Sequence, residues 1–330
     1  MMSHLETNSD GESRAMWPSG RSLIPGVSVQ MSAYNAMPFL VDAVESILKQ
    51  TYQDFDFVII DDGSTDDSVE YLRSIADPRI QVICQPNRGT AAANNHGLQH
   101  CRREYLARMD ADDWSDPDRL RLQAEALDCN PEASIVGSCF AYFGSRTAGP
   151  RIPMPLEHDA INAALMAGDH GLVHGASMMR TESMLRIGGY WEHPFFEDWD
   201  LFLRLGEVGQ LMNLPQSLYL YRAHATSLSS SRLDEMRTHY NYAIAQAKRR
   251  RSGIPTVSLD TFMQQNGTSS GLSRINAKLD NLALRHYRQA MGEIYSTSPW
   301  KGRARLYSSA LWSPARTLQR VRRGIGSIFA

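Results

Sequence analysis

Apolar segments of strand length alternate with amphipathic segments between residues 27 and 128, and this alternation limits the fold more than any other feature of the chain. The expected strands are 27–31, 57–60, 80–84 and 105–109, with 135–142 after them. The segments between have the apolar spacing of helices, at 38–50, 68–76, 91–101 and 119–128. A repeated strand-helix-strand order predicts an α/β fold with a mostly parallel sheet and helices on both faces.

Two acidic segments follow strands of this expected sheet. Asp61 and Asp62 come directly after 57–60, and Asp110-Ala111-Asp112-Asp113 follows 105–109. Ligands of open α/β sheets bind outside the carboxyl ends of the strands, so both segments would face the same crevice. Three carboxylates in four residues repel one another unless a cation lies among them. Such oxygen-rich sites suit Mg²⁺ or Mn²⁺, which commonly bind substrate phosphates.

Each acidic segment also has a simpler interpretation. The segment 110–113 fits a solvated turn in which Ser115 or Asp116 caps the next helix. The sequence Asp-Gly-Ser at 62–64 forms a turn in many proteins. The presence of two such loops at strand ends favours a functional role for 110–113 and for at least one of Asp61 and Asp62.

In this order and spacing, these segments resemble the inverting family 2 glycosyltransferases of GT-A fold. The resemblance extends from about Val27 to Ser229, nearly two-thirds of the chain. Besides the two acidic loops it includes the segments 27–35, 46–52, 87–89, 95–98, 188–190, 197–201 and 221–224. Each segment alone is a weak pattern, and their common order makes the resemblance specific.

The resemblance implies a GT-A fold, a Rossmann-like fold that binds nucleotide-sugars, followed by a C-terminal helical extension. We expect a disordered leader at 1–24, a glycosyltransferase domain at 25–230 and the helical extension at 231–330. Within the domain, 25–150 would bind the nucleotide-sugar and 151–230 the acceptor.

The resemblance also implies the reaction. A sugar would move from a nucleotide diphosphate donor, expected to be a UDP-sugar, to a hydroxyl of a glycan or lipid-linked acceptor. Mn²⁺ or Mg²⁺ would assist a single displacement that inverts the anomeric centre. The family motifs match Asp112 and His224 to the metal ligands and Asp198 to the catalytic base. Asp198 can also cap the helix expected at 199–207, and the aromatic residues before it can raise a carboxylate pKa by limiting water.

The donor contacts that the resemblance implies come from the loops after the strands. Asp61 and Asp62 would hold the base and ribose, with Asp61 preferred because relatives commonly have Asn at the second position. Tyr34 and Asn35 would surround the base, and Asp110 would lie near the ribose. The complete expected set is Tyr34, Asn35, Asp61, Asp62, Asn87, Gly89, Asn95, Asp110 and Ala111.

One position departs from the family pattern. Relatives usually have Ala-Arg-Asn where this chain has Ala93-Asn94-Asn95. The missing arginine leaves a phosphate or packing contact unassigned, and Arg88 is a candidate substitute.

Composition and motifs exclude other classes of protein. A formal net charge of −2 argues against a nucleic-acid binder. Four cysteines without Cys-x-x-Cys spacing predict free thiols in a reducing compartment, and hence a cytoplasmic protein. The glycine-rich turn of NAD-dependent oxidoreductases is missing at 32–35. The remaining alternative is a catalytically silent sugar-nucleotide-binding or scaffold protein, against which the presence of Asp112, Asp198 and His224 argues.

The segment 294–330 contains basic residues and no acidic residue. Lys and Arg alternate there with Trp, Tyr and Leu, which predicts a helix on an anionic bilayer surface, peripheral on the cytoplasmic face of the membrane. The alternative is a helix that packs on the catalytic domain and exposes a basic face to solvent. No apolar stretch approaches the about 20 residues that a spanning helix needs.

Overall fold

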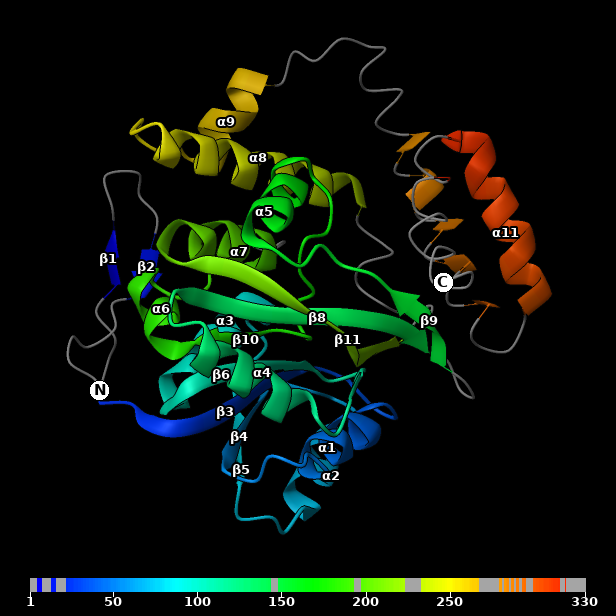
Figure 1. The fold of residues 1–330 in the computed structure, drawn as a ribbon. Helices are drawn as coiled ribbons and strands as arrows, with labels where there is room; N and C mark the ends of the chain where they lie inside the picture. Colours follow the sequence, from blue (N-terminus) through cyan, green and yellow to red (C-terminus); the bar gives the residue numbers. More distant parts are fainter. Residues whose placement is uncertain are drawn as a thin grey trace.

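The computed structural model describes residues 5–7, 13–15, 22–143, 148–192, 197–222, 233–266, 279–314 (except 281, 285, 288, 291–292 and 295–298) and 318. A nine-stranded sheet forms the centre of this part of the chain, and helices cover both of its faces (Figure 1). A separate pair of short antiparallel strands, β1 (Leu5–Thr7) and β2 (Ser13–Ala15), lies within the segment expected to be a disordered leader.

The large sheet is mixed, with a parallel half and a half that contains reversed strands. Its order is β5 (Ile80–Cys84), β4 (Phe55–Asp61), β3 (Ile24–Ala33), β6 (Arg103–Asp110), β10 (Met178–Arg180), β8 (Ala133–Phe143), β11 (Gln210–Arg222) and β7 (Trp114–Ser115), and β9 (Ala148–Ile152) also pairs with β8. The strands β3 to β6 are parallel to one another, as are β8 and β11. Strand β10 lies between β6 and β8 and is antiparallel to both. It therefore joins the expected donor and acceptor halves in one sheet.

The sheet separates two hydrophobic cores. Phe57 and Ile59 of β4 point into one core, and Val58 and Ile60 point into the other, because successive side chains of a strand alternate between faces. The helices of the first core are α1 (Leu40–Leu48), α2 (Ser68–Ser74) and α4 (Arg119–Cys129). The helices of the second are α3 (Thr90–His100), α5 (His158–Met166), α6 (Thr181–Arg186), α7 (Glu197–Val208) and α8 (Leu233–Arg251). Burying such a side chain contributes about 1.5–3 kcal/mol, so both faces stabilise the sheet.

Three strand ends meet at one edge of the sheet. Ala33 at the end of β3 pairs with Asp61 of β4, and Ser32 pairs with Asp110 of β6. The two acidic loops therefore leave the sheet on either side of β3, which confirms that they share one edge.

The expected strands and helices up to residue 143 are confirmed, with bounds that differ by a few residues. The sequence did not predict β7, β9, β10 or the long strand β11. The strand β9 contains Pro150. Proline is tolerated there because β9 pairs only with β8 at an edge of the sheet.

The C-terminal part is helical where the structure describes it. The helix α8 packs on α7, and α9 (Leu259–Asn266) follows it. The helix α11 (Pro299–Trp312) lies beside the end of the sheet that carries β9 (Figure 1) and packs with helical residues of 279–294. Within the described ranges, no helix has both the length and the apolar composition needed to cross a bilayer.

Candidate active site

Asn35 joins the loop after β3 to the loop after β4. Its backbone N–H donates to Ser64 Oγ at 3.0 Å, and its Oδ1 accepts the N–H of Thr65 at 2.7 Å. Asn35 has φ +48°, a conformation that asparagine tolerates better than most residues. Tyr34, next to it, exposes half of its surface at this edge. The two residues expected to surround a base therefore lie in one ordered corner.

Asp61 and Asp62 are both buried but have different partners. Asp61 Oδ2 accepts the N–H groups of Gly63 and Ser64, each at 3.2 Å. Its Oδ1 is buried and has no hydrogen-bond partner among the described residues. Both oxygens of Asp62 accept hydrogen bonds from the loop before α3, namely from Gln85 Nε2 and from the N–H groups of Arg88 and Gly89. Asp61 thus retains an acceptor for a ligand, and Asp62 holds a loop.

The turn between these aspartates and the next loop depends on Gly63. Gly63 has φ +79°, and a Cβ at this position would lie 2.8 Å from the backbone N of Asn87. Any other residue would push the two loops apart. Asn87 and Gly89 are exposed beside this turn, where the resemblance expects donor contacts.

Asn95 and Asn94 are both buried on α3, but only the Asn95 side chain makes hydrogen bonds among the described residues. The Asn95 side chain accepts the N–H of Tyr190 at 2.8 Å and donates to the Tyr190 carbonyl at 2.8 Å and to Glu192 Oε1 at 3.2 Å. Its amide therefore fixes α3 to the segment around Tyr190. Asn94, at the position of the family arginine, is fully buried, and its amide has no partner among the described residues.

Strand β11 holds the acidic loop 110–113 in place. The N–H of Asp110 donates to the Tyr219 hydroxyl at 3.3 Å. Arg222 donates its backbone N–H to Asp113 Oδ1 at 2.7 Å and its Nε–H to the Asp112 carbonyl at 2.6 Å. Gly175 lies so close that a Cβ there would meet Asp110 Oδ2 at 2.5 Å. These contacts hold the acidic loop in one conformation, so it is not a free turn.

The carboxylates of this loop repel one another. Burial raises the pKa of the Asp110 carboxyl, and the charge of Asp112 raises it further. Burial also raises the pKa of Asp113 well above its usual range, with the charges of Asp112 and Asp110 adding to the effect. A divalent cation would relieve this repulsion, and carboxylate oxygens are ligands that Mn²⁺ and Mg²⁺ prefer.

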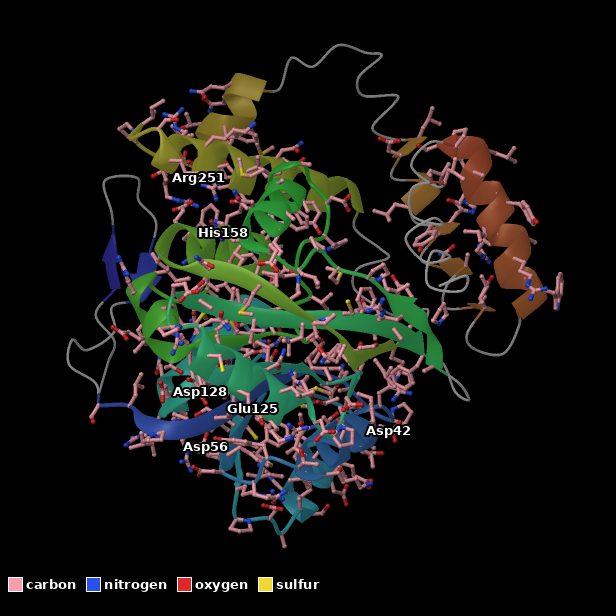
Figure 2. All side chains as sticks on the ribbon, viewed as in Figure 1. Asp42, Asp56, Glu125, Asp128, His158 and Arg251 are labelled. Atoms are coloured by element: carbon pink, nitrogen blue, oxygen red, sulfur yellow. The ribbon has the colours of Figure 1, made fainter. Side chains whose placement is uncertain are left out.

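Arg222 marks the end of the described part of this strand. Its Nη2 pairs with Asp42 Oδ2 on α1 at 2.8 Å (Asp42 is labelled in Figure 2), and its guanidinium lies 4.3 Å from the centre of the Phe143 ring. His224, the second expected metal ligand, belongs to 223–232, outside the described residues. Among the described residues, no three His, Cys, Asp or Glu side chains are grouped as a metal site.

Two buried arginines lie beneath the acidic loop. Arg108 donates to the Gln30 carbonyl at 2.9 Å and pairs with Asp110 Oδ1 at 3.2 Å. Arg119 donates to Ser115 Oγ at 2.7 Å and to the Arg108 carbonyl at 3.1 Å. Burial lowers the pKa of Arg119 to about 10, so it remains charged at neutral pH. Neither residue was predicted as part of the site, although an arginine inside the apolar strand segment 105–109 was a usable signal.

Two acidic residues begin α7, and the charge of Asp110 acts on the first of them, Glu197. The helix α7 begins at Glu197, two residues before the expected start at 199, so Asp198 lies in its first turn and does not precede it as a cap. Asp198 Oδ1 accepts the N–H of Trp199 at 2.7 Å, and its charge is favourable near the start of a helix. Burial and, after it, the charge of Asp198 raise the pKa of Glu197 to about 7, with Arg108 lowering it and Asp110 raising it from β6. The aromatic residues 195–196 lie outside the described residues.

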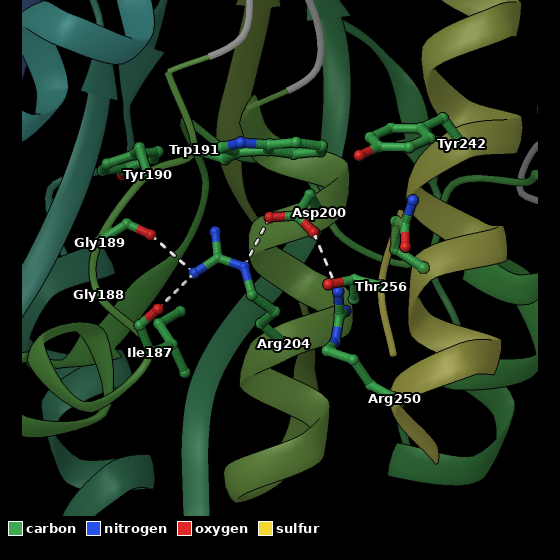
Figure 3. Close-up of a pocket in the computed structure, with 11 residues that line it drawn as sticks. Ile187, Gly188, Gly189, Tyr190, Trp191, Asp200, Arg204, Tyr242, Arg250 and Thr256 are labelled. Carbon is green, nitrogen blue, oxygen red and sulfur yellow. Dashed lines mark hydrogen bonds and ion pairs between the residues drawn. The ribbon is translucent and has the colours of Figure 1, made fainter. Parts of the chain in front are cut away.

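A network of arginines fixes α7 behind its carboxylates (Figure 3). Arg204 pairs with Asp200 at 2.6 Å and donates to the carbonyls of Ile187 and Gly189 at 2.8 Å. Arg250 of α8 lies 3.7 Å from the other Asp200 oxygen. The cavity among these residues is about 30 Å³, room for one or two waters and too small for a sugar. The residues around this cavity therefore support α7, and the cavity itself is not a substrate site.

Glu197→Gln is expected to change the pH dependence of stability. Because the folded state raises the Glu197 pKa from 4.5 to about 7, its stabilising contribution is present below pH 4.5 and is lost as the pH rises through 7. The variant removes this loss, so it should be more stable than the wild type by about 1–2 kcal/mol at about pH 8 and equal at about pH 4. Urea unfolding at both pH values measures the difference. Glu70→Gln, at an exposed position, serves as control. An equal effect of the two substitutions on stability would contradict the assignment of the raised pKa to Glu197.

Comparison with known proteins identifies the family of the chain. Residues 28–188 match the family model for glycosyl transferase family 2. EpsE of Bacillus subtilis (strain 168), described as a glycosyltransferase, is 35% identical over 211 residues, which cover 60% of this chain and 73% of EpsE. An uncharacterized glycosyltransferase of Haemophilus influenzae is 30% identical over 226 residues, which cover 62% of this chain and 68% of that protein.

Solved structures share the fold at low sequence identity. TarS 1-349 of S. aureus in complex with UDP-GlcNAc has a TM-score of 0.55 at 15% identity, over 86% of this chain and 88% of that one. The mannosyltransferase PcManGT from Pyrobaculum calidifontis, in complex with GDP-Man and Mn²⁺, has a TM-score of 0.54 at 15% identity, over 93% and 88%. The chain belongs to glycosyl transferase family 2 and is a glycosyltransferase.

Proposed function

We propose that this enzyme transfers a sugar from a UDP-sugar to a hydroxyl of a glycan or lipid-linked acceptor, with inversion, using Asp198 as base and Mn²⁺ or Mg²⁺ held by Asp112 and His224. The observation that carries the proposal is the arrangement of the acidic loop 110–113. Strand β11 fixes this loop at the sheet edge, where its carboxylates repel one another, and the charge of Asp110 acts on Glu197 at the start of α7.

The nucleotide side of the proposal rests on Asp61. Its unpartnered, buried Oδ1 can accept the imide N–H of uracil in a charge-assisted hydrogen bond. Tyr34 and Asn35 lie in the corner beside it and can contact the base. Asp62 and Asn95, whose polar atoms are used within the protein, support the donor loops in this proposal without needing to touch the donor.

A divalent metal at Asp112 would neutralise the charge that grows on the departing diphosphate. His224 follows Arg222 by two residues, a reach of at most about 7 Å, and Arg222 itself contacts the carbonyl of Asp112. Arg108 and Arg119 keep positive charge beneath the loop and favour the binding of phosphates above it.

The acceptor hydroxyl must lose its proton as it attacks. In the proposed step, its oxygen forms a bond to the anomeric carbon, the bond from that carbon to the diphosphate oxygen breaks, and the proton passes to the Asp198 carboxylate. Attack opposite the leaving group inverts the anomeric configuration. The side chains that begin α7 suit this role because the arginine network behind them fixes the helix.

Thermal unfolding with a panel of sugar nucleotides and Mn²⁺ tests the donor site. A UDP-sugar at 100 times its dissociation constant should stabilise the protein by about 2.7 kcal/mol, and EDTA should remove most of this effect. Slow hydrolysis of the same donor should accompany binding, whereas a catalytically silent binding protein would show binding alone.

Asp61→Asn is the matched variant, because it leaves the shape of the site and removes the acceptor charge. It should reduce the UDP-sugar effect. A larger stabilisation by GDP-sugars, or an unchanged response of Asp61→Asn, would contradict the UDP assignment.

A further inference from the structure

The helix α11 has one face that packs against the protein. Ser309 is fully buried and donates to the Ala283 carbonyl at 2.8 Å. Arg305 pairs with Glu293 at 3.0 Å, and a Cβ on the buried Gly302 would lie 2.6 Å from the backbone N of Ile294. Such close contacts fix the rotation of α11 on the residues 279–294.

The opposite face of α11 presents large apolar side chains to solvent. Trp300, Tyr307 and Leu311 expose 70%, 78% and 82% of their surfaces. They are spaced by seven and four residues, so they lie along one line of the helix. We name Trp300, Tyr307 and Leu311 the α11 apolar face. A contiguous group of this kind on the surface indicates a partner that covers it.

Charge indicates which partner fits. Lys301 and Arg303 flank the α11 apolar face, and both are exposed. The whole segment 294–330 carries seven basic residues and no acidic residue. A second copy of the same segment would be repelled by this charge, whereas an anionic surface would be attracted. Trp and Tyr prefer the boundary between water and lipid, where their apolar rings are buried and their polar groups stay hydrated.

We propose that the α11 apolar face docks on an anionic lipid bilayer, with Lys301 and Arg303 at the headgroups. The orientation follows from the contacts of the other face: Ser309, Arg305 and Gly302 are used within the protein. The packed face of α11 contacts residues 283–294 of the helical extension, and its opposite face is apolar and flanked by basic residues.

Co-sedimentation of the full chain with vesicles tests the proposal. The protein should sediment with vesicles of phosphatidylcholine and phosphatidylglycerol, and not with phosphatidylcholine alone. Binding should weaken at high salt, because the attraction to anionic lipid is screened. The double variant Tyr307→Ser, Leu311→Ser should lower the partition constant at least about tenfold, since two large side chains no longer insert.

Met263→Ser on α9 is the matched control, because Met263 is also exposed by half but lies outside the face. It should bind as the wild type does. Donor hydrolysis and circular dichroism should be unchanged in both variants, which shows that they fold.

Three results would overturn the proposal. They are absence of binding to anionic vesicles, equal loss in the double variant and in Met263→Ser, and a shift of the double variant from dimer to monomer in light scattering without any vesicle binding. The last result would identify a second copy of the chain as the partner.

Discussion

Asparagine in place of Asp198 is expected to lower the rate of sugar transfer by about 10²–10⁴-fold, the usual effect of losing a general base. Asparagine keeps the shape of the side chain and an oxygen that can accept the Trp199 N–H, so α7 should begin as before. It cannot take a proton from the acceptor hydroxyl. Donor affinity should stay within a few fold, because the base faces the acceptor in the proposed site.

Glu197→Gln is the comparison that separates the two carboxylates of α7. Rates at saturating donor and calorimetric donor affinities should be measured for both variants. A large rate loss in Glu197→Gln with a small one in Asp198→Asn would exchange their roles, and the Glu197 pKa of about 7 makes that comparison worthwhile. Lost donor binding with an unchanged maximal rate would move Asp198 into the nucleotide site. Product with the donor's anomeric configuration, read from proton NMR couplings, would rule out a single displacement.

Asp112→Asn is expected to lower transfer by about 10³-fold or more, because several kcal/mol of charge stabilisation on the departing diphosphate would be lost with the metal. The affinity for UDP in the presence of Mn²⁺ should also fall. The apo protein should be no less stable, since the charge of Asp112 raises the pKa values of Asp110 and Asp113 and its removal relieves that repulsion.

Metal titrations of activity measure this effect. Asp118→Asn removes the same charge at an exposed position beside α4, and it should behave as the wild type does. His224→Ala should raise the metal concentration needed for half-maximal activity. Full activity of the wild type in EDTA would rule out the metal, and an unchanged titration in His224→Ala would remove that residue from the site.

The sequence predicted the parallel half of the fold because its signals are local. Each strand from β3 to β6 is an apolar run, and each helix between them has its own periodicity. Strands β10 and β7 are three and two residues long, too short to carry a pattern, and their pairing depends on residues far away. Strand β11 carries Asn213, Pro215 and Gln216 inside its apolar run, which hides it from a periodicity analysis.

Sequence motifs predicted the residues of the site, but they did not predict which contacts these residues make. Asp61 and Asp62 are adjacent in sequence and equivalent by pattern, yet one retains an acceptor and the other holds the loop before α3. Which of the two aspartates keeps an acceptor for a ligand depends on the paths of the neighbouring loops. For the same reason Arg222 was quoted only as part of a motif, although its partners Asp113 and Asp42 lie 109 and 180 positions earlier.

The dependence of the acidic loop on Arg222 also has a consequence for the order of folding. Strands β3 to β6 can pair early, since they are close in the sequence, but the loop that follows β6 acquires its final contacts only when β11 joins β8. Contacts across 109 residues form late, because the entropy of closing so long a segment must be overcome first. A nascent chain that has not yet released residue 222 from the ribosome would hold a nearly finished sheet without a finished acidic loop. Catalytic competence would therefore appear in one step near the end of folding, and incomplete chains would not consume nucleotide-sugar.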